Sequence, residues 1–206
     1  MNAGQMVERV YLRSGYPKDD PLVTPEAVLS AVNEALGAIA AERDWPYLQT
    51  STTFASVVGT ATYALPASYN RTRRLLNANG DPLERADARQ LEETFGLDRG
   101  QPGYFAVDNE LLVLRPIPDA VVTYTHFYVR VEKVMTADTE TPYLPAQFHD
   151  GAVALAESIA FEIGRDEKRA EKAKDRYEKL WRPRMIDDAR RTRGPLRPRI
   201  RSGSAF

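Results

Sequence analysis

The sequence contains no cysteine and only two histidines in 206 residues. The absence of cysteine excludes disulfides, thiolate zinc sites and cysteine nucleophiles. The histidines, His126 and His149, stand in segments of different pattern, and neither has a second histidine at helical ligand spacing. We interpret each as a packing or capping residue. Because the chain also lacks a glycine-rich phosphate loop and a GxSxG motif, we expect no catalytic residue, no cofactor and no bound metal.

Long apolar runs are absent as well. No window approaches the length of a membrane span, and the N-terminus lacks the apolar run and the small-residue cleavage site of a signal peptide. The chain is 43% hydrophobic and 28% charged, which is enough for a folded core. The net charge of −1 argues against a general nucleic-acid coating protein. We therefore expect a protein that is made in the cytoplasm and has no membrane partner.

Two adjacent pairs of carboxylates, Glu92-Glu93 and Asp187-Asp188, are the remaining candidates for acid–base chemistry. Neighbouring residues on a helix point in different directions, so neither pair forms a catalytic dyad by itself. The aromatic residues of the central segment could stack nucleic-acid bases, but no basic stripe is interleaved with them. Packing in the core and at its rim is therefore the favoured interpretation of these aromatic residues.

Positive charge is concentrated at the C-terminus. Residues 189–206 contain six arginines and no acidic residue, whereas residues 1–188 contain 22 basic and 29 acidic residues, a net charge of −7. Prolines and glycines in the same stretch oppose a regular helix, so residues 190–206 are predicted to form an extended basic arm. A solvated chain end is the alternative. The candidate residues for docking on another protein or an adjacent subunit are Arg190, Arg191, Arg193, Arg197, Arg199, Arg201 and Phe206.

Residues 1–50 are predicted to be helical. Gly15 is a plausible stop for a first helix, and Thr24 before Pro25 has the chemistry of an N-cap. The second helix carries an apolar stripe at helical spacing that consists of Leu29, Val32, Leu36 and Ile39. The dipeptide Trp45-Pro46 is expected to end this helix, because a residue before proline avoids helical backbone angles.

Residues 51–135 change to the alternating pattern of strands. The segments on either side of Gly59 resemble a hairpin, and those on either side of Asp108-Asn109 resemble a second one. Residues 121–131 are rich in β-branched and aromatic side chains and are predicted to form the longest strand. We expect five or six strands, mostly antiparallel because their connections are short.

Residues 136–189 return to helical spacing. One side of the second helical run carries Ala170, Ala173, Tyr177 and Trp181. The small alanines would permit close approach of another helix, from this chain or from a neighbouring subunit. Pro183 is expected to kink or end the run. The order of helices, strands and helices predicts an α+β fold, in which helices from both chain ends form a bundle and a β-rich lobe is inserted between them.

Six short motifs follow one another along the chain. They are Val32-Asn33-Glu34-Ala35, Trp45-Pro46-Tyr47-Leu48, Gly59-Thr60-Ala61-Thr62-Tyr63-Ala64-Leu65-Pro66, Gln101-Pro102-Gly103-Tyr104-Phe105, Leu114-Arg115-Pro116-Ile117-Pro118-Asp119 and Leu144-Pro145-Ala146-Gln147-Phe148-His149. On these motifs, which together cover most of residues 24–190, the chain resembles the head-to-tail adaptor proteins of tailed bacteriophages. The opening helix matches that pattern loosely, and the basic arm does not align with it.

The resemblance implies a ring-shaped oligomer, usually a dodecamer, beneath the phage portal, with a central channel for double-stranded viral DNA. It also implies docking on the portal protein above and on a stopper or tail protein below, in the neck of the virion. The residues leave two other functions open. One is a DNA-associated module that binds phosphates through the arginine arm, and the less favoured one is a cell-wall hydrolase accessory protein.

Overall fold

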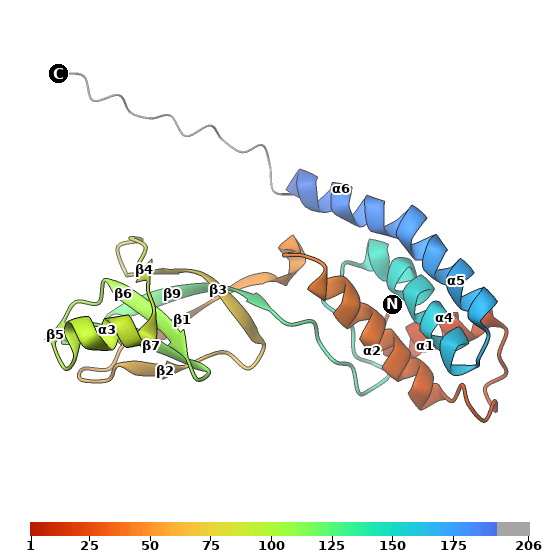
Figure 1. The fold of residues 1–206 in the computed structure, drawn as a ribbon, viewed down its shortest axis with the longest axis horizontal. Coiled ribbons are helices and arrows are strands. Elements are labelled where there is room, and N and C mark those ends of the chain that lie inside the picture. The colour runs from red at the N-terminus through yellow and green to blue at the C-terminus, as the bar shows by residue number, and fades with distance from the viewer. Residues whose placement is uncertain (193–206) are drawn as a thin grey trace, which may run out of the picture. The chain divides into compact units, whose positions relative to one another are not determined.

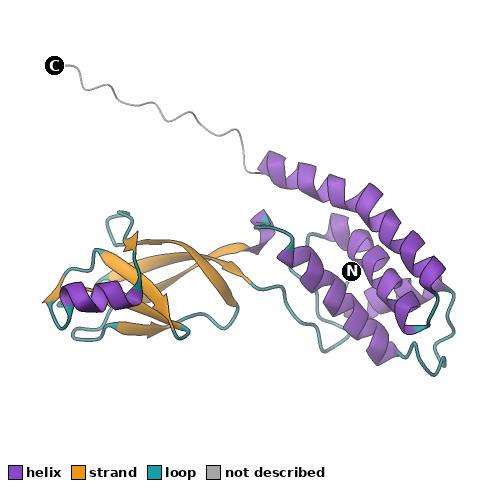
Figure 2. Ribbon diagram, in the orientation of Figure 1, coloured by secondary structure: helices purple, strands orange, loops and turns teal. Residues whose placement is uncertain are grey.

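The computed structural model describes residues 1–192, and these residues form two compact units. The helical unit comprises Met1–Tyr47 and the described residues from Lys133 onward, and the β unit comprises Leu48–Glu132. Figures 1 and 2 show that helices build the first unit, while strands make up most of the second. The predicted α+β fold, with strands inserted between two helical segments, is confirmed.

Local capping chemistry fixes the first two helices. Helix α1, Ala3–Ser14, begins with a capping box between Asn2 and Gln5 and ends at Gly15, whose φ of 74° is left-handed. Helix α2, Pro25–Ala41, begins at Thr24, whose hydroxyl accepts a hydrogen bond from the Ala27 amide. The predicted stop at Gly15 and the predicted N-cap at Thr24 are both confirmed.

The buried stripe of α2 differs slightly from the predicted one. It consists of Val28, Ala31, Val32, Ala35, Leu36 and Ile39. Leu29 is only half-buried, so the stripe is rotated toward the alanines. The helix also ends at Ala41, before Trp45-Pro46, and the indole N–H of Trp45 donates a hydrogen bond to the carbonyl of Ile39 in its last turn. The buried tryptophan therefore adds a side-chain donor to this terminal carbonyl, which also accepts a hydrogen bond from the Glu42 N–H.

Helix α4, His149–Ile163, is the centre of the helical unit. It follows a short 3₁₀ turn at Ala146–Phe148 and contacts α1, α2 and α5. Ten of its fifteen residues are buried, because helices pack on several of its faces. Asn33 of α2 fixes the chain where it returns from the β unit, since its side chain bonds both the N–H and the carbonyl of Met135.

The last helical stretch passes through Pro183 without ending. Helix α5, Glu167–Arg176, continues into a π-helical turn, Tyr177–Trp181, and then into α6, Arg182–Thr192. Proline has no N–H and its ring clashes with the preceding turn of an α-helix. The wider π turn before Pro183 accommodates that ring, with the Arg182 N–H bonded to the Tyr177 carbonyl. Of the two predicted outcomes at Pro183, a kink or an end of the helix, the end does not occur.

The β unit contains more strands than the five or six predicted. They are β1 (Gln49–Ala55), β2 (Thr62–Ala64), β3 (Tyr69–Leu76), β4 (Glu84–Arg85), β5 (Arg99–Gly100), β6 (Tyr104–Asp108), β7 (Leu111–Arg115), β8 (Ile117–Pro118) and β9 (Thr123–Arg130). Three sheets result, with strand orders β1-β9-β3, β2-β7-β6-β4 and β5-β8. The longer pairs are antiparallel, whereas β4 with β6 and β5 with β8 are parallel.

One predicted hairpin forms and the other does not. Strands β6 and β7 pair across the Asp108-Asn109 turn, as predicted. Strands β1 and β2 do not pair with each other, because β1 pairs with β9 and β2 pairs with β7. The turn at Gly59 therefore carries the chain from one sheet to another instead of closing a hairpin.

The β unit has three layers. The β1-β9-β3 sheet packs against the β2-β7-β6-β4 sheet through a core that consists of Leu75, Leu83, Phe105, Leu112, Leu114 and Tyr124. Helix α3, Ala88–Phe95, contacts β6 and β7 and brings the ring of Phe95 within 5.4 Å of the ring of Tyr104. Because Tyr104 and Phe105 point to opposite faces of β6, α3 covers the face that lies away from the core.

Candidate docking surfaces

The four residues predicted on one side of the last helical run lie within the chain's own helical packing. Ala170, Ala173 and Tyr177 are buried, and the two alanines cluster with Phe161 of α4. Trp181 is half-buried and packs on Gly151, where an added Cβ would lie 3.1 Å from the Cβ of Trp181. The structure shows these residues in helix–helix packing within the chain, which is one of the two predicted alternatives. Packing against a neighbouring subunit stays a prediction.

A carboxylate joins the π-helical turn to the end of α2. Glu42 accepts a 2.8 Å hydrogen bond from the hydroxyl of Tyr177 and a 2.9 Å hydrogen bond from Nε of Arg182. Burial, and then the hydrogen bond and charge of Glu42, strongly raise the pKa of Tyr177. The tyrosine therefore stays a neutral donor, and this contact fixes where α6 begins.

An apolar pocket of about 220 Å³ lies beside the last turns of α6. Its lining consists of Trp45, Pro46, Tyr47, Pro145, Phe148, Met185, Asp188, Ala189 and Thr192. The rings of Trp45 and Tyr47 stack with centroids 6.2 Å apart. Asp188 is the one charged residue in this lining, so the pocket would accept an apolar group beside a cation.

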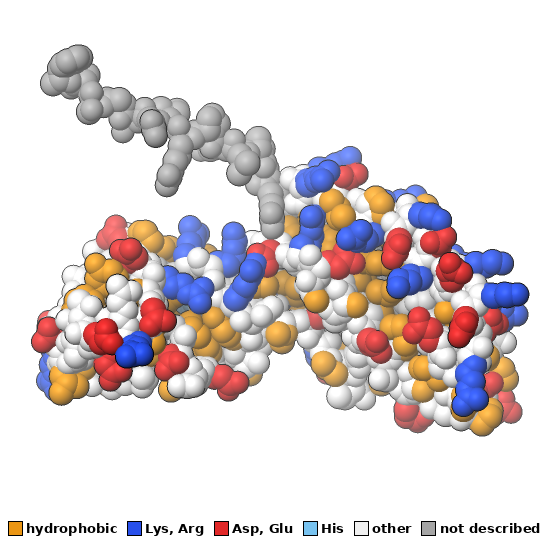
Figure 3. All heavy atoms as spheres, viewed as in Figure 1, with side chains coloured by type: hydrophobic (Ala, Val, Ile, Leu, Met, Phe, Trp, Pro, Cys, Tyr) orange, Lys and Arg blue, Asp and Glu red, His pale blue; other side chains and the backbone are white. Residues whose placement is uncertain are grey.

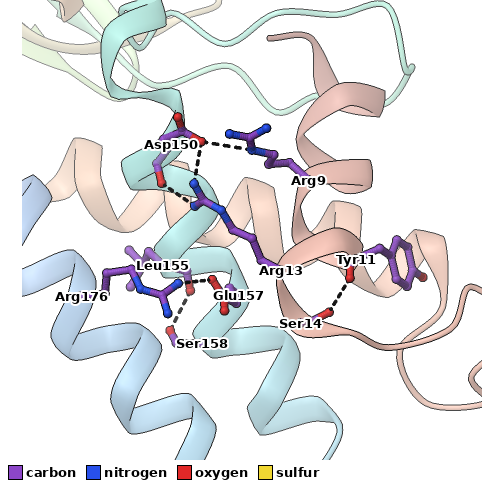
Figure 4. A network of polar contacts seen from close by, with 9 residues as sticks. All are labelled: Arg9, Tyr11, Arg13, Ser14, Asp150, Leu155, Glu157, Ser158 and Arg176. Carbon is purple, nitrogen blue, oxygen red and sulfur yellow. Dashed lines mark hydrogen bonds and ion pairs between the residues drawn. The ribbon is translucent and has the colours of Figure 1, made fainter.

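A network of ion pairs connects α4 to the helices on its two sides (Figure 4). Asp150 pairs with Arg13 at 2.9 Å and with Arg9 at 3.4 Å, which joins α4 to α1. Glu157, whose side chain is only 4% exposed, pairs with Arg176 of α5 at 2.9 Å. These contacts line an open basic cleft, but its arginines are already bound to carboxylates of the same unit, so their main effect is to position α1 and α5.

The beginning of the predicted arm is helical. Arg190 and Arg191 lie in the last turn of α6 and are exposed, and Arg190 is 3.6 Å from Asp187. The prediction of an extended chain from residue 190 was therefore wrong for residues 190–192. Burial of Met185 and Ala189, four residues apart on one face, extends the helix that far. The other candidate docking residues, Arg193, Arg197, Arg199, Arg201 and Phe206, lie outside the described residues.

The β unit presents a group of exposed aliphatic side chains on neighbouring loops. The exposed fractions are 56% for Val57, 51% for Val58, 86% for Leu97 and 69% for Val121. The first and last of these loops are joined by hydrogen bonds from Ser56, whose N–H donates to the carbonyl of Val122 and whose hydroxyl donates to the carbonyl of Ala120. We call these four residues the aliphatic tip. Exposed apolar side chains mark a protein-binding surface where they form one contiguous patch, so these four residues are a candidate docking surface.

Both histidines are buried and hydrogen-bonded within the fold. His126 Nε2 lies 2.9 Å from the hydroxyl of Thr72, and burial lowers the pKa of His126 to about 4. His149 lies between the carbonyl of Leu144 and the amino group of Met1, and burial lowers its pKa as well. Within residues 1–192, no group of three acidic or histidine side chains could hold a metal ion. No helix in this part of the chain is long and apolar enough to cross a membrane.

Sequence reasoning missed the contacts that hold the last helices in place. Glu42 was not singled out, because a carboxylate at a helix end gives no signal of a distant partner. Gly151 gave a usable signal, since a glycine inside an otherwise apolar helix often marks a close packing contact. The apolar pocket could not be predicted from the sequence, because its lining comes from three separate segments of the chain.

The family model described as SU10 adaptor protein matches residues 1–199, which is nearly the whole chain and includes both units. No curated protein matches the chain.

Proposed function

The chain belongs to the SU10 adaptor protein family, a family of phage head-to-tail adaptors, and from this premise we propose a specific assembly role. Copies of the chain form a ring beneath the phage portal and continue its channel. Double-stranded DNA passes through this channel without sequence-specific binding. The ring presents a docking surface to a stopper or tail protein on its other side. The observation that carries the proposal is the family match over residues 1–199. The proposed role is that of a structural virion protein in the neck.

The surfaces of the two units support this role. The aliphatic tip of the β unit offers exposed apolar area on loops that hydrogen bonds hold in place. The helical unit ends in α6, whose last residue is Thr192, and the six arginines of residues 189–206 begin in its last turn. A protein that joins two others needs at least two separate binding surfaces, and we propose these two for that role.

The arginine arm is proposed to dock on an acidic surface of the portal or of an adjacent subunit. Arginine forks form bidentate hydrogen bonds with carboxylates, which lysine cannot match. Phe206 would add one apolar anchor at the end of the arm. Ordering a chain segment costs conformational entropy, so docking requires a partner that offsets this cost.

The boundary of α6 defines where the arm should be cut. Ala189 is buried, and the hydroxyl of Thr192 donates a hydrogen bond to the carbonyl of Asp188. Removal of residues 193–206 therefore leaves the described fold whole, whereas a cut before Arg190 would shorten α6. We expect the truncated protein to melt like the full chain and to lose its binding to the portal ring.

The test is the mass of the full chain alone and mixed with its portal protein, in the absence of nucleic acid. The proposal requires that the chain add to the portal as a defined multiple. A matched variant with lysine at positions 193, 197, 199 and 201 keeps the charge and removes the guanidinium forks. It should bind the portal more weakly than the full chain but better than the truncated protein. A truncated protein that binds the portal like the full chain would contradict the docking arm.

A DNA-binding role for the arm is the second candidate, because residues 189–206 carry six positive charges and no acidic group. It requires salt-dependent affinity for duplex DNA that disappears with residues 193–206. The adaptor role instead requires portal binding that persists after nuclease treatment.

We further propose that the protein has no enzymatic activity, and release of peptidoglycan fragments by the purified chain would contradict this.

A further inference from the structure

The β unit separates its charges between two regions. The strands β1, β9 and β3 contain four arginines and no acidic residue, which gives this sheet a charge of +4. The rest of Leu48–Glu132 contains four arginines and ten acidic residues, a charge of −6. Figure 3 shows acidic side chains around α3 and basic side chains gathered nearer β3. A net charge of −2 for the unit therefore hides two surfaces of opposite sign.

The basic surface is the outer face of the β1-β9-β3 sheet. Its strands place Ser51, Phe127 and Arg74 opposite one another in a row across the sheet. The guanidinium of Arg74 lies 4.3 Å from the centroid of the Phe127 ring, and Arg73 donates a hydrogen bond to the side chain of Gln49. Arg73 and Arg74 are exposed but held in position by these contacts. We call these five residues the arginine face.

The acidic surface is centred on α3. Glu92 and Glu93 are exposed on this helix, and Asp98 is exposed on the loop that follows it. Arg89 pairs with Glu93 at 3.1 Å, whereas Glu92 has no ion-pair partner among the described residues. Because α3 covers the side of the β2-β7-β6-β4 sheet that faces away from the core, the acidic surface and the arginine face belong to different outer layers of the unit.

We propose that the arginine face of one copy docks on the α3 surface of the next copy. The two surfaces differ from each other, so the contact is heterologous, and a heterologous contact that closes on itself gives a ring. Charge complementarity between the two surfaces is what selects a second copy as the partner. This inference rests on the proposed ring and adds the surfaces through which neighbouring β units meet.

The composition of the arginine face favours a protein partner over DNA. Residues 48–132 contain eight arginines and no lysine. Arginine and aromatic residues are enriched in protein interfaces, from which lysine is depleted, whereas both cations contact DNA phosphates. A guanidinium stacked on Phe127 is also held ready to bind a carboxylate with two parallel hydrogen bonds.

Charge reversal tests the contact in the full chain. The variant Arg73→Glu with Arg74→Glu changes the charge of the five-residue arginine face from +2 to −2, and the variant Glu92→Arg with Glu93→Arg reverses the two exposed charges of α3. Each variant alone should self-associate at least about tenfold more weakly than the natural chain. An equimolar mixture of the two should associate again, because unlike copies can alternate. The variant with all four substitutions should also associate, because its two surfaces have exchanged sign.

The control variant is Lys168→Glu with Lys174→Glu, which changes the charge by the same amount on α5 of the helical unit. It should associate like the natural chain. Analytical ultracentrifugation at about 50 mM and 500 mM salt measures all five proteins and the mixture, and the natural chain should associate more weakly at high salt. Thermal melting confirms that each variant is folded, and the pair Arg73→Gln with Arg74→Gln replaces the first variant if reversal unfolds the unit.

Three results would overturn the inference. One is equal self-association of the reversed variants and the natural chain, and another is failure of the mixture to associate. The third is loss of duplex DNA binding in the Arg73→Glu, Arg74→Glu variant with self-association unchanged, which would make the arginine face a nucleic-acid surface. If these variants still add to the portal as a ring, the proposed function stands and only this contact is wrong.

Discussion

Replacement of Gly164 by alanine probes the packing that positions the last helices. Gly164 ends α4, and a Cβ at this position would lie 2.1 Å from the hydroxyl oxygen of Tyr16 and 2.6 Å from its Cζ. The ring of Tyr16 packs on Phe161 with centroids 5.8 Å apart. Alanine at residue 164 therefore forces the Tyr16 ring to move and weakens its contact with Phe161. The backbone itself would tolerate alanine, because φ at Gly164 is −76°.

Whether Gly164→Ala destabilises or stabilises the helical unit should depend on the presence of the Tyr16 side chain. In the natural chain, overpacking should lower the free energy of unfolding of the helical unit by about 1–3 kcal/mol. The lower part of that range is expected, because the end of the Tyr16 side chain can move. In a Tyr16→Ala background the obstacle is gone, and Gly164→Ala should then stabilise by about 0.4–1 kcal/mol, since alanine reduces the entropy of the unfolded chain.

Urea titration followed by circular dichroism at 222 nm measures all four members of this double-mutant cycle. The matched control is Gly37→Ala in α2, where an added Cβ meets nothing within 4 Å. That substitution should stabilise the helical unit by about 0.5–1 kcal/mol, because glycine disfavours a helix interior. If Gly164→Ala had the same effect with and without Tyr16, the steric argument would be refuted.

Two further predictions concern buried polar groups. Glu42→Ala should lower the free energy of unfolding in a urea titration by about 1–3 kcal/mol, because it leaves the buried hydroxyl of Tyr177 without its acceptor. Arg182→Ala should lower it far less, because the ion pair of Arg182 with Glu42 is exposed. The pKa of His126 is about 4 in the fold and 6.5 when unperturbed, so only the unfolded state takes up a proton between these values. Stability of the β unit should therefore fall by up to about 3 kcal/mol as pH drops from 6.5 to 4, and His126→Gln, which can still bond Thr72, should remove this dependence in tyrosine near-UV circular dichroism.

Features decided by local chemistry could be predicted from the sequence. The N-cap at Thr24, the stop at Gly15 and the β6–β7 hairpin each depend on a few adjacent residues. The order of helical, strand and helical segments followed from two changes of hydrophobic period. These signals are present in the chain before it folds, so no knowledge of distant contacts was needed.

Features decided by distant contacts could not be predicted. Strand β1 pairs with β9, and most of the residues of the β unit lie between these two strands along the chain. No residue of β1 indicates which strand it pairs with. The Gly59 turn resembled a hairpin turn, yet Tyr63 folds back on it and donates a hydrogen bond to the carbonyl of Thr60. A turn that is stabilised by its own side chains gives the same sequence pattern whether or not its flanking strands pair.

The start of the arm shows how a real signal can be outweighed. The prolines and glycines beyond residue 192 and the run of arginines predicted that the arm begins at residue 190, and Pro183 was predicted to kink or end the helix. Met185 and Ala189, four residues apart, carried the opposite signal, and their burial keeps α6 helical to Thr192. Apolar spacing is therefore better evidence for the boundary than the nearest proline.

The candidate docking surfaces are hard to predict for a different reason, because the residues of such a surface are scattered along the chain. A protein interface of ordinary size draws on twenty to thirty residues per partner, most of which contribute little individually. In the β unit, the arginine face becomes a surface only when β9 places Phe127 between Ser51 of β1 and Arg74 of β3. Along the chain no basic stripe accompanies the aromatic residues, which is why base stacking was set aside. Strand order creates the stripe, so a search for motifs along the chain does not find it.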